Sequence, residues 1–169
     1  AGYTSAQTGT PTISASAGAD FEVKAPSTFS GYITVKTQAV GADTPSLSLL
    51  PGDYSVKLVS TDGNSTVTGL TPETTTSGDP KYGRHRFENA DATKEYNIVV
   101  TKTGVNAGSW TVPDRLVSLA NRTNQGLILY ELKTADDGSS GVTTTGDGYY
   151  LAGVGVTITA TASVGNMAF

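Results

Sequence analysis

Residues 54–67, YSVKLVSTDGNSTV, decide the fold class of this chain. The apolar residues Tyr54, Val56 and Leu58 alternate with polar ones, and a period of two places them on one face of a β-strand. The TDGN sequence that follows favours a tight turn, after which residues 65–70 return as a short strand. The stretch therefore predicts a β-hairpin with one buried face.

The same alternation recurs along the rest of the chain. It is found in GYITVKTQAV from Gly31, in EYNIVVTKT at 95–103 and in the more apolar LILYEL at 127–132, with turn-forming residues between them. We therefore expect an all-β fold in which residues 25–169 form one antiparallel β-sandwich, either immunoglobulin-like or a jelly roll. A short helix over 113–123, PDRLVSLANRT, is the alternative there, because its leucines share a helical face.

The composition excludes several classes of function. The 169 residues include no cysteine and one histidine, which excludes thiolate catalysis, Cys-based zinc sites and sites that need two histidines. The net charge of −4 argues against nucleic acid as a partner, because such proteins need a basic face. No apolar run approaches the roughly 18 residues of a membrane-spanning helix, so no membrane span is expected. The polar, Lys-poor composition and the start at Ala1 predict an extracellular or cell-surface protein, secreted through a signal peptide removed before Ala1.

The longest alternating stretches lie near the two ends of the chain. Residues 13–23, ISASAGADFEV, predict one long strand, and residues 1–24 are expected to form an N-terminal arm. Residues 149–164 predict a second long strand, in which apolar residues alternate from Val154 to Val164. Both stretches use alanine where a core strand would carry larger side chains, which suits a narrow groove in a neighbouring subunit. The candidate interface residues are Ile13, Ala15, Ala17, Ala19, Phe21 and Val23 in the first stretch and Val154, Val156, Ile158, Ala160 and Ala162 in the second.

These two segments, TISASAGADFEV and GYYLAGVGVTITATASV, resemble the terminal strands of pilin subunits that assemble by donor-strand exchange. The resemblance implies an immunoglobulin-like fold that lacks one strand, export from the cell, and a fimbrial fibre in which each subunit lends a strand to the next. Archaeal surface filaments with the same assembly logic fit equally well. A head-to-tail contact of this kind produces an open polymer, so the expected partner is a second copy of the chain. The expected role is structural and not enzymatic.

Few residues are candidates for chemistry. His85 lies between two arginines, and without a nucleophile sequence of the G-x-S-x-G type it is interpreted as an exposed strand residue. Asp136, Asp137 and Asp147 lie in glycine-rich turns and offer oxygen ligands that suit Ca²⁺, although aspartate in turns commonly binds the local backbone instead. No other cofactor is expected.

Two other functions stay open at this stage. One is a monomeric surface module that binds carbohydrate or a host ligand, with or without Ca²⁺, and the other is a virion capsid or decoration protein. Asn64 and Asn121 begin N-glycosylation sequons, which matter only in a cell that modifies them. A sugar-binding platform would draw on the aromatic residues Tyr3, Tyr32, Trp110, Tyr149 and Tyr150.

Overall fold

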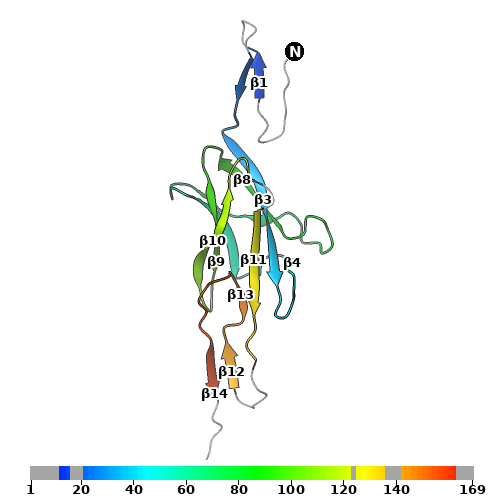
Figure 1. Cartoon of the computed structure of the whole chain (residues 1–169), viewed down its shortest axis with the longest axis vertical. Coiled ribbons are helices and arrows are strands. Elements are labelled where there is room, and N and C mark those ends of the chain that lie inside the picture. The colour runs from blue at the N-terminus through cyan, green and yellow to red at the C-terminus, as the bar shows by residue number, and fades with distance from the viewer. Residues whose placement is uncertain (1–11, 16–20, 123–124, 136–141, 163–169) are drawn as a thin grey trace, which may run out of the picture.

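The computed structural model describes residues 12–15, 21–122, 125–135 and 142–162, and within these ranges the fold is all-β with no helix (Figure 1). The prediction of the fold class is confirmed. The strands are β1 (Thr12–Ala15), β2 (Phe21–Lys24), β3 (Thr28–Gln38), β4 (Ser46–Leu47), β5 (Tyr54–Ser60), β6 (Thr66–Val67), β7 (Thr71–Pro72), β8 (Arg84–Asp91), β9 (Tyr96–Lys102), β10 (Gly108–Val117), β11 (Gln125–Leu132), β12 (Val142–Thr145), β13 (Gly148–Tyr150) and β14 (Thr159–Ala162).

Two larger sheets form the body of the molecule. One has four strands in the order β10-β9-β5-β6, and the other has six, in the order β13-β11-β3-β8-β7 with β4 paired to β3. Most neighbouring strands are antiparallel, as expected. The exception is β11, which runs parallel to β3 with Leu127 opposite Val35. The prediction of a purely antiparallel fold is wrong at this pair, because β3 and β11 are far apart in sequence and no short hairpin fixes their direction.

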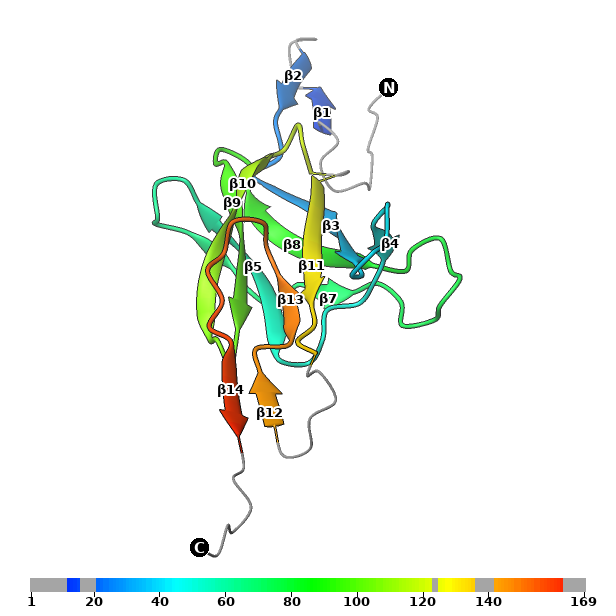
Figure 2. The same ribbon diagram turned by 60° about the horizontal axis from the view of Figure 1, so that its bottom comes forward.

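The two sheets share one hydrophobic core (Figure 2). The inward positions of β5 and β9 alternate as the sequence predicts, and Ile33 and Val35 of β3 are fully buried against them. Each large side chain removed from water contributes about 1.5–3 kcal/mol, so these alternating positions supply much of the stability. The fully buried side chains include Phe29, Ile33, Val35, Leu58, Tyr96, Ile98, Val100, Val117, Leu127 and Leu129.

The predicted turn at 61–64 is confirmed. The Ser60 amide donates to the Ser65 carbonyl at 2.8 Å, and β6 returns along β5 with Val67 opposite Leu58. A carboxylate oxygen of Asp62 accepts bonds from the Ser60 hydroxyl and the Asn64 amide, and these bonds hold the Asp62 pKa well below its usual range. This arrangement shows why aspartate was selected at the second turn position.

The alternative of a helix over 113–123 is wrong for the residues that the structure describes. Residues up to Val117 belong to β10, an edge strand whose pairing with β9 shifts register between Thr111 and Leu116. Pro113 lies inside that shift, where a strand does not need the amide hydrogen that proline lacks. A proline that suits the first turn of a helix is equally suited to a bulge at a sheet edge.

Candidate functional site

The N-terminal stretch forms a hairpin instead of one long strand. β1 pairs with β2 antiparallel, with Ile13 opposite Val23 and Ala15 opposite Phe21. The prediction of a continuous strand over 13–23 is therefore wrong. A hint lies in the sequence between the two strands, where Gly18 and Asp20 are turn formers that the alternation conceals.

The hairpin keeps the predicted apolar face despite this change. Since residues directly opposite each other in a ladder share a face, Ile13, Ala15, Phe21 and Val23 lie on one side of the two-stranded sheet. Ser14 and Glu22 lie on the other side. Ala17 and Ala19, also candidates for the interface, lie outside the described residues.

The C-terminal candidates are divided between an irregular segment and a second hairpin. The predicted strand over 149–164 is wrong in extent, because within the described residues it divides into the end of β13, which stops at Tyr150, an irregular segment, and β14, which begins at Thr159. Val154 packs against the core and Val156 is half-buried, whereas Ile158 is 54% exposed. Hydrogen bonds between Asn106 and the main chain of Thr157 hold this segment beside the body and replace a regular ladder.

The remaining two candidates, Ala160 and Ala162, belong to the β12–β14 hairpin. They lie opposite Thr144 and Val142, so these four residues share one face. The other face carries only threonines, Thr143 with Thr161 and Thr145 with Thr159. The side chain of Ala160 is exposed in the isolated subunit.

The two hairpins project from opposite ends of the long axis of the molecule (Figure 1). Each is a separate two-stranded sheet in which neither strand pairs with a strand of the body. A two-stranded hairpin alone in water is at best marginally stable and normally needs a third strand or a packed surface. Both ends of the described chain therefore carry a hairpin that has no third strand among the described residues.

The body also has open sheet edges. β13 covers β11 only along Tyr130–Leu132, and among the described strands no other pairs with that edge of β11 over 126–129. Leu127 and Leu129 in this part of β11 are fully buried. β10 is likewise paired on one side only, and it contacts β11 where the two sheets meet. An unpaired edge beside a buried core is a template for a strand from another chain.

A hollow of about 330 Å³ lies at the C-terminal end of β11, where β13 pairs with this strand. Leu132 and Tyr150 line it from the sheet, and Val154 and Val156 line it from the irregular segment. The lining is mainly apolar, so side chains of an added strand would find room and hydrophobic contact there.

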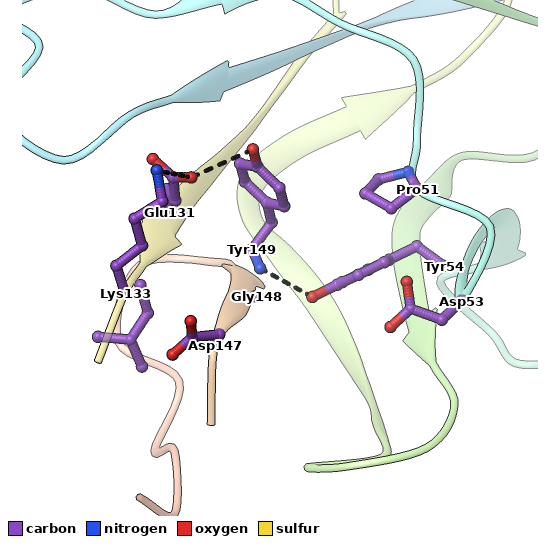
Figure 3. A pocket seen from close by; sticks show the side chains of 9 residues that line it. Pro51, Asp53, Tyr54, Glu131, Lys133, Asp147, Gly148 and Tyr149 are labelled. Atoms are coloured by element: carbon purple, nitrogen blue, oxygen red, sulfur yellow. Dashed lines mark hydrogen bonds and ion pairs between the residues drawn. The ribbon is translucent and has the colours of Figure 1, made fainter. Parts of the chain in front are cut away.

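A second hollow, of about 340 Å³, contains Asp147 together with two other carboxylates (Figure 3). Each carboxylate is already engaged. Asp147 accepts bonds from the amide and the hydroxyl of Thr134, Glu131 contacts Lys133 at 2.9 Å, and Asp53 contacts Lys102 at 3.2 Å.

These contacts decide what the second hollow can do. The Thr134 hydroxyl and amide lower the pKa of Asp147, which acts as a turn-stabilising residue. No group of three acidic or histidine side chains close enough to hold a metal ion occurs in the part of the chain that the structure describes. Asp136 and Asp137, the other candidates for Ca²⁺, lie outside that part.

Two tyrosines form the wall of this hollow and connect β13 to β5. The Tyr149 amide donates to the Tyr54 hydroxyl at 2.9 Å (Figure 3), and burial raises the pKa of Tyr54 to about 12. The Lys102 side chain is 5% exposed, and its ammonium group lies 5.5 Å from the centroid of the Tyr54 ring and donates to the Val105 carbonyl oxygen. This cluster fastens the start of β5 to the end of β9 and explains why a charged residue occupies a core position.

His85 is buried, and the prediction of an exposed strand residue is wrong. It is 2% exposed, and its Nδ1 lies 3.3 Å from the Gly83 carbonyl oxygen. Burial lowers its pKa. The sequence predicts the strand correctly but assigns the His85 side chain to the wrong face of it, because the flanking arginines occupy the outward positions.

The aromatic residues proposed as a sugar platform do not gather on one surface. Tyr150 is buried in an edge-to-face contact with Trp110, with ring centroids 6.3 Å apart. Tyr32 lies instead beneath Arg84, on the outer face of the six-stranded sheet. Tyr3 lies outside the described residues. The two sequon asparagines, Asn64 and Asn121, are both exposed.

Comparisons with known proteins identify no relative: no protein-family model, curated protein or solved structure matches the chain. A search of the described residues for a helix that could span a membrane finds none.

Proposed function

We propose that this chain is a structural subunit of an extracellular filament, a β-sandwich that polymerises through inter-subunit β-strand complementation. The observation that carries the proposal is the pair of two-stranded hairpins at opposite ends of the molecule, each with one mainly apolar face and, among the described strands, no strand of the body paired beside it. An end-to-end contact between unlike surfaces repeats without closing, and its product is a fibre.

In this proposal the N-terminal segment is the donor. Its apolar residues Ile13, Phe21 and Val23 would be buried against the next subunit, each contributing about 1.5–3 kcal/mol. Association of two proteins costs about 4–15 kcal/mol in lost freedom, so these side chains alone are not enough. The added strand must also pair its main chain with an open edge, and β11 over 126–129 offers one, with the mainly apolar hollow further along the same strand at 130–132.

Deletion of residues 1–24 tests the proposal. Among the residues whose burial is described the core begins at Phe29, and β1 and β2 pair with each other and with no other described strand, so the shortened chain should fold with an unchanged melting temperature. We expect the full chain to form regular fibres at high concentration in negative-stain electron micrographs, with and without Ca²⁺. The shortened chain should stay monomeric under the same conditions. Dispersed monomers of the full chain at every concentration would refute the proposal.

A further inference from the structure

The outer face of the six-stranded sheet carries a third hollow, away from both terminal hairpins. Its volume is about 330 Å³, at the small end of the range for small-molecule sites. Four strands, β3, β4, β8 and β11, and the loop before β8 form it. The residues used in the argument below are Thr34, Lys36, Leu47, Tyr82, Arg84 and Gly126.

Small residues in the middle of the sheet make the hollow. Arg84, Thr34 and Gly126 lie side by side on β8, β3 and β11. A Cβ atom added to Gly126 would meet nothing within 4 Å, so the space above this strand position is empty. The bottom of the hollow therefore lies at Thr34 and Gly126, below the longer side chains that surround it.

One glycine brings the loop over the sheet to form a wall. Gly83 has a φ of +81°, and a Cβ there would lie 2.9 Å from the Val35 carbonyl oxygen. Its own carbonyl accepts the Val35 amide at 2.6 Å. Because only glycine tolerates both the conformation and the close approach, the loop is held against β3 and places Tyr82 over the hollow.

Two cations line the hollow, and neither forms an ion pair within the described part of the chain. These are Lys36 and Arg84, both half-buried. The guanidinium carbon of Arg84 lies 4.6 Å from the centroid of the Tyr32 ring, a contact that holds the guanidinium group in place. Arg86, two residues further along β8, is instead paired with Glu88 at 3.0 Å and points into solvent.

The nearby acidic residues do not occupy the hollow. Glu73 directly follows β7 and its amide donates to the Arg84 carbonyl oxygen at 2.9 Å, but its side chain is not part of the lining. Asp79 accepts the amide of Lys81 within its own turn. Glu73 offsets part of the positive charge, and the whole chain has a net charge of −4, so the site suits one negative charge better than two or more.

We propose that this hollow binds an acidic sugar, a pyranose ring that bears one carboxylate, as a free monosaccharide or as a unit of a polysaccharide. Arg84 and Lys36 bind the carboxylate through charge-assisted hydrogen bonds. The hydroxyls of Thr34 and Tyr82 reach the hydroxyls of the sugar, and Leu47 covers the apolar face of the ring. None of the residues of this site belongs to either hairpin, and Gly126 alone among them lies on the edge of β11 that the proposed function assigns to the added strand.

Saturation-transfer difference NMR with glucuronate tests the proposal, since the method detects ligand bound to either monomers or polymers. We expect saturable transfer with a dissociation constant on the order of 1 mM, typical of about −4 kcal/mol of binding. Glucose, which has the ring without the carboxylate, and acetate, which has the carboxylate without the ring, should each bind at least ten-fold more weakly. An alginate or other polyuronate should compete with glucuronate if a uronate unit of the polymer also enters the hollow.

Three variants test whether glucuronate binds in this hollow. Arg84→Gln should weaken glucuronate binding at least ten-fold. Gly126→Val fills the space above β11, so it should abolish binding while leaving the melting temperature close to that of the parent chain. Arg86→Gln is the matched control on the same strand and should bind as the parent does. Absence of saturable transfer, equal binding of glucose or inorganic phosphate, or full binding by Arg84→Gln and Gly126→Val would overturn the proposal.

Discussion

Substitution of Ala160 by aspartate distinguishes an assembly surface from an ordinary exposed position. Ala160 is exposed in the isolated subunit and belongs to the apolar face of the β12–β14 hairpin. Thr161, the next residue, is exposed on the opposite, all-threonine face. Ala160→Asp and Thr161→Asp therefore add the same charge to the same strand, on different faces.

The expected magnitudes differ between the subunit and the polymer. In the unassembled subunit both positions are in water, so each variant should change the free energy of unfolding by no more than about 0.5 kcal/mol. In the polymer an aspartate at 160 would lose its water without gaining a partner, which costs several kcal/mol. A cost of even about 3 kcal/mol per contact raises the critical concentration for polymerisation more than 100-fold, since about 1.4 kcal/mol is a factor of ten.

The assay is a sedimentation series that measures the concentration of protein left in the supernatant, with electron microscopy of the pellet. Thermal melting of dilute samples shows that both variants fold. We expect the parent chain and Thr161→Asp to share one critical concentration, and Ala160→Asp to remain in the supernatant. Equal assembly of all three proteins, or equal loss in both variants, would refute the assignment of this face to the contact.

The remaining predictions concern the stability of the subunit. Because burial lowers the pKa of His85, the unfolded chain binds a proton that the folded chain does not, and the free energy of unfolding should fall as pH drops below about 6.5. A pH series of urea unfolding measures this dependence. The variant His85→Gln should show no such dependence above pH 5. The carboxylates with lowered pKa values titrate below that window, and the sequence contains one histidine, so persistence of the slope in His85→Gln would contradict the argument. Lys102→Met should change the unfolding free energy by no more than about 1 kcal/mol, because Asp53 stays about half in water and methionine has a side-chain volume similar to that of lysine. A loss of more than about 3 kcal/mol would show that the ion pair between Lys102 and Asp53 is essential for stability. Leu129→Ala should cost about 2–5 kcal/mol in the same assay because Leu129 is fully buried, and a cost below about 1 kcal/mol would show that the core beside the open edge of β11 is loosely packed.

The parts of the fold that follow from the sequence are those with one buried face and a local turn. Tyr54, Val56 and Leu58 are buried as their spacing predicts, because a shift of one residue would move all three into solvent. The turn at 61–64 fixes the return of β6 through Asp62 and Asn64. Such signals are complete within a dozen residues, and no distant contact is needed to interpret them.

Pairings between distant segments do not follow from the sequence in the same way. The parallel ladder of β3 and β11 joins residues near 33 to residues near 125, and alternation says nothing about direction. The N-terminal stretch shows the converse error, because its alternation is continuous in the sequence although β1 and β2 are two separate strands that pair antiparallel. Period-two patterns report the face of a residue and leave strand length and partner undetermined.

The candidate sites differ in how far the sequence anticipates them. The residues of the hairpin faces are visible as alternation, whereas the outer-face hollow depends on Gly126, which has no signal of its own until β3 and β8 place Thr34 and Arg84 beside it. The two proposals also reinforce each other. A filament of these subunits would display the hollow once per repeat, and linked weak sites reach an avidity about 10²–10⁴ times that of a single site when one polymer spans several of them. A polyuronate should therefore bind the assembled fibre far more tightly than it binds the chain that lacks residues 1–24, although both carry the same hollow.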